Sequence, residues 1–177
     1  STGLVNRNDF PENLGSLTVL IPRTDTRDYQ VQLYGPGTYF WNKYREIPLR
    51  SQWGVDFYGS GAVQSRLDNY IALDPHKRDE YGVPEINVHF SYSEQDKDII
   101  RQMSEGMKQI SQVIKSPFIS MNGNSDMCLR YPGKDLHEMG TCRIGRDPST
   151  SAADPYGQIH GISNLYVADN SVIPTSG

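Results

Sequence analysis

The sequence predicts an α+β fold in which an antiparallel β-sheet is covered by helices. Two segments, residues 29–33 and 86–92, alternate apolar and polar residues with the period of a half-buried strand. A third segment, from Ser93 to about Ile114, repeats its apolar residues at helical spacing. Several short strands beside one long helix are typical of an α+β domain.

The ends of the helix are also marked in the sequence. Ser93 can cap the free amides of the first turn, with Asp96 three residues later in a capping-box arrangement. Pro117 is expected to end the helix. Its apolar face is expected to consist of Ile99, Ile100, Met103, Met107, Ile110 and Ile114.

Further strands are expected at residues 17–21, 55–58, 62–67 and 70–73. Asp68-Asn69 is expected to join the last two as a tight hairpin, because both residue types tolerate positive φ. Residues 1–16 lack a clear pattern and are expected to be irregular, and the charged stretch 74–81 is expected to be exposed. Residues 164–169 are expected to form a buried strand that ends in the carboxylate of Asp169.

Composition excludes several classes of function. The chain has 177 residues and a net charge of −4, without a Lys/Arg cluster, so we expect no nucleic-acid partner. No apolar run approaches the ~20 residues of a membrane span, and the N-terminus lacks the features of a signal peptide. Because the sequence does not begin with Met, we expect it to be cut from a longer chain. Its location stays open, with the cytoplasm favoured because no Asn-x-Ser/Thr sequon occurs.

Two cysteines, Cys128 and Cys142, are too few for a disulfide framework, and a reduced pair is expected. No metal site is expected, because no second pair with ligand spacing accompanies His137 and Cys142. The chain also carries no dinucleotide-binding fingerprint, since Phe40 and Gln64 stand where the third glycine would be. A hydrolase is not indicated either, because residues 123–127 lack the final glycine of a nucleophile elbow.

Residues 137–145 carry the densest functional signal. An imidazole such as that of His137 can accept a proton near neutral pH, and the nearby Gly140 and Gly145 let a ligand approach the backbone. A loop histidine satisfied by backbone groups is the alternative interpretation and stays open on these residues alone. His89 is expected to be structural or on the surface, and His76 to be solvated.

This C-terminal stretch resembles a known family signature. The pattern His137-x-x-Gly140-Thr141-x-Arg143-Ile144-Gly145, then residues 147–151 and 160–169, then Ser171 and Pro174, is similar in order and spacing to the C-terminal signature of the glucose–methanol–choline (GMC) oxidoreductases. Residues 1–8 resemble, more loosely, the segment that leaves the flavin domain in pyranose-oxidase-like members.

The resemblance implies a substrate domain whose sheet lies over a flavin, with a C-terminal tail that returns to a separate FAD-binding domain. Such enzymes oxidise the CH–OH group of a sugar or other alcohol, a histidine accepting the hydroxyl proton while hydride passes to FAD. His137 matches that base. Asp169 matches a carboxylate that holds the FAD ribityl or phosphate region, and Asn170, Gly140, Thr141 and Pro174 are further expected cofactor contacts.

The resemblance also implies a domain plan. Residues 1–16 would leave the FAD domain, residues 17–135 would form the substrate domain, and residues 136–177 would form the catalytic-His loop and the FAD-contacting tail. The family's second active-site side chain is expected beyond Gly177, so this chain alone is expected to be incomplete. Two alternatives remain: a non-catalytic carbohydrate- or partner-binding module, or a subunit completed by a separate FAD-binding chain. The sequence does not name the sugar or the electron acceptor.

Overall fold

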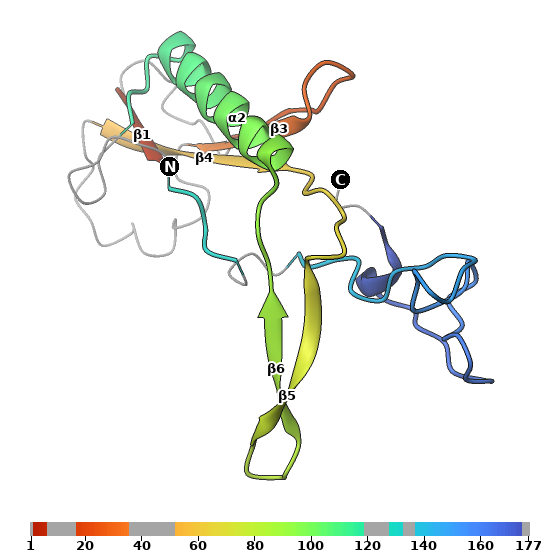
Figure 1. Ribbon diagram of the computed structural model, residues 1–177. Helices are drawn as coiled ribbons and strands as arrows, with labels where there is room; N and C mark the ends of the chain where they lie inside the picture. Colours follow the sequence, from red (N-terminus) through yellow and green to blue (C-terminus); the bar gives the residue numbers. More distant parts are fainter. Residues whose placement is uncertain (1, 7–16, 36–51, 119–127, 133–136, 175–177) are drawn as a thin grey trace. The chain divides into compact units, whose positions relative to one another are not determined.

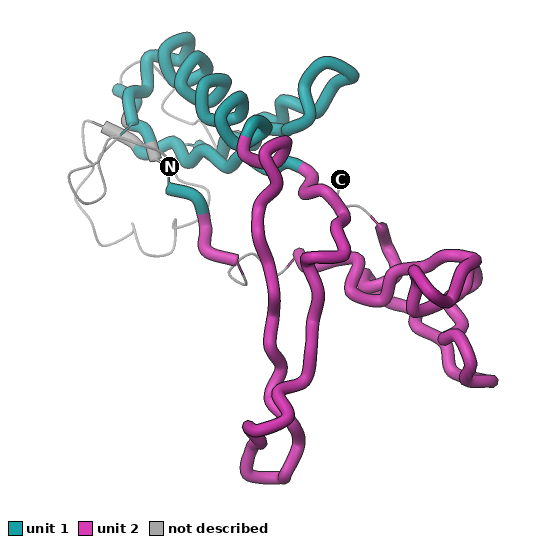
Figure 2. Tube along the Cα trace, viewed as in Figure 1, with its two compact units in different colours: residues 1–61, 98–129 teal, residues 62–97, 130–177 magenta. Residues whose placement is uncertain are grey.

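The computed structural model describes residues 2–6, 17–35, 52–118, 128–132 and 137–174. The chain divides into two compact units, each described here by itself (Figure 2). The first consists of residues 1–61 and 98–129, and the second of residues 62–97 and 130–177. None of the described helices combines the length and apolar character needed to cross a membrane.

The first unit contains a four-stranded antiparallel sheet with the order β1-β4-β3-β2. Its strands are β1 (Thr2–Asn6), β2 (Leu17–Ile21), β3 (Tyr29–Gly35) and β4 (Gln52–Gly61). The expectation that residues 1–16 are irregular is therefore wrong at Thr2–Asn6. This short segment becomes a strand because it pairs with β4, which lies about 50 residues away in the sequence, and no local pattern announces that partner.

Helix α2 (Glu94–Val113) lies across one face of this sheet (Figure 1). Every second residue of β3 is buried, as the alternation predicts. The backbone approaches the helix closely at Gly59, where a Cβ atom would lie 2.6 Å from Met103 Sδ and 2.9 Å from Met107 Sδ. The buried core consists of Val5, Tyr29, Val31, Leu33, Val55, Phe57, Ile99 and Met107.

Both ends of α2 follow the predicted signals. Ser93 Oγ accepts from the amide of Asp96 at 3.1 Å, and the Asp96 carboxylate accepts from the amide of Ser93 at 2.7 Å. At the other end Lys115 takes the left-handed conformation with φ 52°, and Ser116 N donates to Ser111 O at 2.8 Å. The helix therefore ends at Val113, four residues before Pro117.

In the second unit, β5 (Tyr70–Arg78) and β6 (Pro84–His89) form an exposed antiparallel hairpin. Its turn is closed by Asp79, whose amide donates to Val83 O at 2.9 Å. The predicted hairpin at Asp68-Asn69 is wrong, because residues 62–67 form no strand. Their polar groups bind elsewhere: Gln64 N donates to Asp96, and Ser65 Oγ accepts from Arg143.

The C-terminal part of this unit consists of loops tied by isolated bridges. Ala153, which is fully buried, bridges Ile144 and Ile159. The prediction of a buried strand at residues 164–169 is wrong: Leu165 is 47% and Tyr166 58% exposed, and the described bridge is a single one, from Tyr166 to Gln158.

Candidate active-site loop

His137 begins an irregular loop, residues 137–145, in the second unit. Its side chain is exposed, and no hydrogen bond to its imidazole is found among the described residues. Three residues later Gly140 has φ +76°, a conformation that favours glycine. The imidazole is therefore accessible, and the chain turns sharply just after it.

Two backbone hydrogen bonds join this loop to the C-terminal turn. Gly140 N donates to Asn170 O at 3.3 Å, and Cys142 N donates to Ser171 O at 2.9 Å. A Cβ atom at Gly140 would lie 3.4 Å from Ile173 O and 3.9 Å from Pro174 O. The structure thus brings Gly140 together with Asn170 and Pro174. Thr141, beside Gly140, is exposed.

Asp169 caps the short 3-10 helix η2 (Asn170–Val172). Its Oδ1 accepts from the Ser171 hydroxyl at 2.5 Å and from the Ser171 amide at 2.8 Å. These two bonds hold the pKa of Asp169 below its ordinary value. Asp169 is therefore an ionised acceptor at neutral pH, and no described residue donates to its Oδ2.

The far end of the loop is tied to residues 151–153. Gly145 N donates to Ala153 O at 2.8 Å, and Ala152 N donates to Arg143 O at the same distance. The Arg143 guanidinium donates to Ser65 Oγ at 2.9 Å. The loop is consequently supported at both ends by segments distant in the sequence.

A contact between Ser151 and His160 was not predicted from the sequence. His160 Nε2 lies 2.9 Å from Ser151 Oγ and 3.1 Å from Gly145 O. Neighbouring Asp147 has a lowered pKa, mainly through hydrogen bonds from Ser149 and to a smaller extent through the charge of His160. The signal was present, since both Ser151 and His160 fall inside the family-like stretch, but a pattern of residues does not show which side chains meet.

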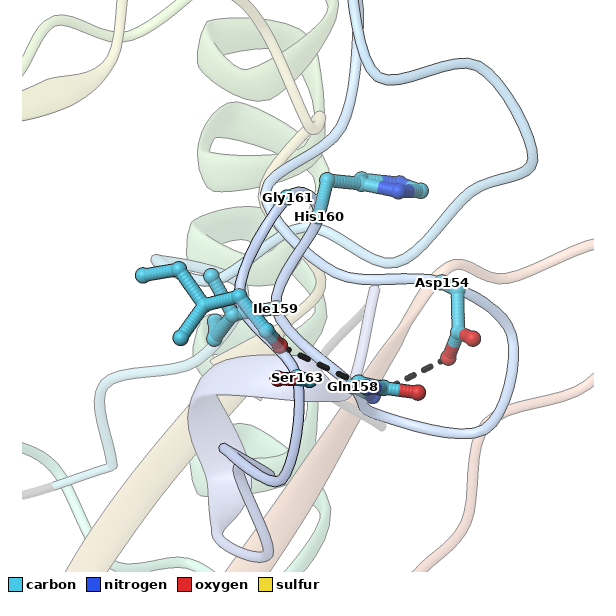
Figure 3. A pocket seen from close by; sticks show the side chains of 7 residues that line it. Asp154, Gln158, Ile159, His160, Gly161 and Ser163 are labelled. Atoms are coloured by element: carbon cyan, nitrogen blue, oxygen red, sulfur yellow. Dashed lines mark hydrogen bonds between the residues drawn. The ribbon is translucent and has the colours of Figure 1, made fainter.

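A hollow of about 330 Å³ lies beside His160 (Figure 3). Two of its polar lining residues are engaged in hydrogen bonds: Asp154 Oδ1 accepts from Gln158 N at 3.0 Å, and Gln158 Nε2 donates to Ile162 O at 3.4 Å. The side chains of Ile159 and His160 leave the loop in opposite directions (Figure 3). These hydrogen bonds fix the conformation of the loop of residues 154–162, which contains His160.

Of the remaining candidates, His76, His89 and Cys128 are exposed and Cys142 is half-buried. His89 is exposed and stacks on Tyr70 with ring centroids 4.2 Å apart, and His76 is exposed, as expected. Cys128 and Cys142 are free thiols. Within the described ranges, no three His, Cys, Asp or Glu side chains gather as metal ligands would.

Comparison with known proteins matches the chain to one family. A family model described as GMC oxidoreductase matches residues 64–177. Pyranose 2-oxidase of Tricholoma matsutake is 32% identical over 165 residues, which cover 88% of this chain and 28% of the relative. The 6'''-hydroxyparomomycin C oxidase of Streptomyces lividus is 29% identical over 116 residues, or 66% of this chain and 20% of the relative.

A third relative, C-glycoside 3-oxidase of Arthrobacter globiformis, is 27% identical over 116 residues, which cover 65% of this chain and 21% of the relative. The chain thus spans between 20% and 28% of the length of these curated relatives. The family match covers well over half of the chain and includes the whole loop that begins at His137. The chain belongs to the GMC oxidoreductase family.

Proposed function

We propose that this chain is the substrate-side part of an FAD-dependent oxidoreductase that oxidises the CH–OH group of a sugar or other alcohol. The observation that carries the proposal is the backbone connection between the His137 loop and the turn after Asp169. It links an accessible imidazole and an ionised carboxylate through a few hydrogen-bonded residues. The names of several relatives, among them pyranose 2-oxidase and C-glycoside 3-oxidase, support a sugar-like substrate.

The residues of the turn fit part of FAD. An ionised carboxylate can only accept hydrogen bonds, so the free Oδ2 of Asp169 suits a hydroxyl of the ribityl chain, whereas a phosphate would be repelled. Gly140 has no side chain to obstruct a ligand beside Asn170 and Pro174. The remaining FAD contacts would come from a dinucleotide-binding portion, either on the same polypeptide or on a separate chain.

His137 would act as the base. A neutral imidazole accepts the hydroxyl proton of the substrate, the carbon gives up its hydrogen with both bonding electrons, and a C=O bond forms. FAD, when bound, supplies the acceptor for that hydride. Removing the proton places negative charge on the oxygen and makes the neighbouring C–H bond a better hydride donor. The base must therefore be held at hydrogen-bond distance from the hydroxyl.

Stopped-flow reduction of the flavin in the FAD-containing protein tests this role. We expect His137→Ala to slow reduction by about 10²–10⁴-fold, the usual contribution of a positioned general base. Substrate affinity should change much less, because the lost interaction forms mainly in the transition state. His89→Ala and His76→Ala are the matched controls, since both histidines are exposed and lie outside the loop. A normal rate in His137→Ala, with a collapse in His89→Ala, would show that the base is assigned to the wrong residue.

A further inference from the structure

The contact between Ser151 and His160 has a direction that the hydrogen bonds determine. Ser151 Oγ donates its single hydrogen to Asp147 O at 2.6 Å, so in its contact with His160 Nε2 it must accept. The carbonyl oxygen of Gly145, on the other side of Nε2, can also only accept. His160 Nε2 therefore carries a hydrogen that two acceptors share.

This shared hydrogen holds the last residue of the loop. The carbonyl oxygen of Gly145 accepts from His160 Nε2, and the amide of Gly145 donates to Ala153 O at 2.8 Å. The backbone amide of His160 itself donates to Ala152 O at 3.1 Å. His160 thus binds the loop end and its supporting segment at the same time, through its side chain and its main chain.

The other end of the same span is fixed at the C-terminal turn, through Gly140 N to Asn170 O and Cys142 N to Ser171 O. Residues 140–145 are therefore held at both ends, and His137 precedes this span by three residues. A shift at Gly145 would be transmitted along a span that has little regular structure of its own. Both supports therefore restrain the backbone that follows His137.

We propose that His160 is a positioning residue for the oxidation, an inference that rests on the proposed function of His137. It acts by donating from Nε2 to Gly145 O and Ser151 Oγ, which fixes the backbone of the loop. A misplacement of about 1 Å in a catalytic group can lower a rate by about 10²-fold. Loss of the Nε2 donor should therefore slow proton removal without removing any group that touches the substrate.

Two amide substitutions provide a matched test. His160→Gln retains an N–H donor near the position of Nε2, whereas His160→Asn is shorter and brings its donor nearer to the position of Nδ1. The first measurement is amide hydrogen exchange of residues 143–153 in the full protein. We expect exchange there to rise about tenfold or more in His160→Asn and to stay near the wild-type rate in His160→Gln.

The second measurement is the rate of flavin reduction with FAD bound. We expect His160→Asn to be about 10–100-fold slower with little change in substrate affinity, and His160→Gln to recover most of the rate. Faster exchange with an unchanged reduction rate would overturn the proposal, because the contact would then hold the loop without positioning the base. Faster exchange over the whole chain would also overturn it, since His160 would then be a general stabiliser.

His137→Ala separates this inference from the function on which it rests. If His137→Ala leaves flavin reduction unchanged, the proposed base is wrong and the positioning role of His160 fails with it. If His137→Ala abolishes reduction but His160→Asn changes neither exchange nor rate, the base assignment stands and the inference about His160 alone is overturned.

Discussion

Replacing Asp96 by asparagine should loosen the start of α2 and the segment packed against it. The side chain is 2% exposed, and its two oxygens accept from Gln64 N at 2.8 Å and Ser93 N at 2.7 Å. Asparagine has the same shape but one oxygen, so one of these amides loses its acceptor. A buried amide without an acceptor costs about 1–3 kcal/mol, and the loss of a helix cap about 0.5–2 kcal/mol. Because these terms overlap, we expect Asp96→Asn to lower the free energy of unfolding by about 2 kcal/mol.

The pH dependence gives a second, independent signature. Burial by itself would raise the pKa of Asp96, but the hydrogen bonds from Gln64 and Ser93 outweigh it and the pKa is lowered. A group whose folded pKa lies below its unfolded value stabilises the protein above the unfolded pKa and loses that contribution as the pH falls through the folded pKa. The difference between wild type and Asp96→Asn should be complete at neutral pH and should shrink below about pH 4.

Urea unfolding followed by the helical circular dichroism signal, at neutral and at acid pH, measures both effects. The control is Asp98→Asn, in the same part of α2, because the Asp98 side chain is 54% exposed and, among the described residues, pairs with Arg101 on the surface. Such a pair contributes about 0.2–1 kcal/mol at most. The reasoning is refuted if Asp96→Asn is no more destabilising than Asp98→Asn, or if its effect is the same at both pH values.

Ser116 is fully buried, and no described residue forms a hydrogen bond with its Oγ, so Ser116→Ala should raise the unfolding free energy by about 1 kcal/mol. Ser111→Ala should not, because Ser111 Oγ donates to a helix carbonyl at 2.9 Å. Lys115→Gly should raise the free energy of unfolding by about 0.5–1 kcal/mol, because Lys115 occupies a left-handed position with φ 52° that favours glycine. The melting temperature should therefore rise, and a lower melting temperature would contradict this. Thiol titration of the unfolded, unreduced protein should find Cys128 and Cys142 both free, and a result of no free thiols would show a bridge.

The sequence predicted α2 closely because its signals are local. The cap at Ser93, the apolar spacing from Ile99 onward and the stop before Pro117 all act within a few residues of the helix itself. The alternation in β3 was equally informative, since a strand that packs one face against a core must alternate. Both elements belong to the buried core, where pattern and structure are most tightly linked.

The failed strand predictions share a different cause. A strand needs a partner for its backbone groups, and local composition does not name that partner. Residues 62–67 have strand-like side chains, but Gln64 N donates to the Asp96 side chain instead of to a neighbouring strand. Residues 164–169 are apolar enough for a buried strand, yet Leu165 and Tyr166 are exposed. Their backbone contacts go to nearby residues: Leu165 O accepts from Ile159 N at 2.9 Å, and Tyr166 forms an isolated bridge with Gln158. In contrast, Thr2–Asn6 becomes a strand because β4 is available to it.

The candidate site shows the same division between residues and their contacts. His137 and Asp169 were proposed as site residues because each occupies a fixed place in the family-like pattern, and both assignments stay predictions. The structure adds that Gly140, Cys142 and Gly145 serve through their backbones, at 3.3, 2.9 and 2.8 Å from their respective carbonyl partners. Each of these contacts depends on where the backbone lies and not on a side chain. Glycines and small residues at fixed spacing suit such contacts, because they let the backbone come close to its partner.

The family-like pattern therefore describes a supported loop in which His137 is the proposed base. The amides of Gly140 and Cys142 and the carbonyl of Gly145 each meet a partner outside the loop. A base must be held within a fraction of an ångström to be effective, and a loop without regular structure can achieve this only through several distant contacts. The exposure of His137 and the restraint of the residues after it are two requirements of the proposed reaction.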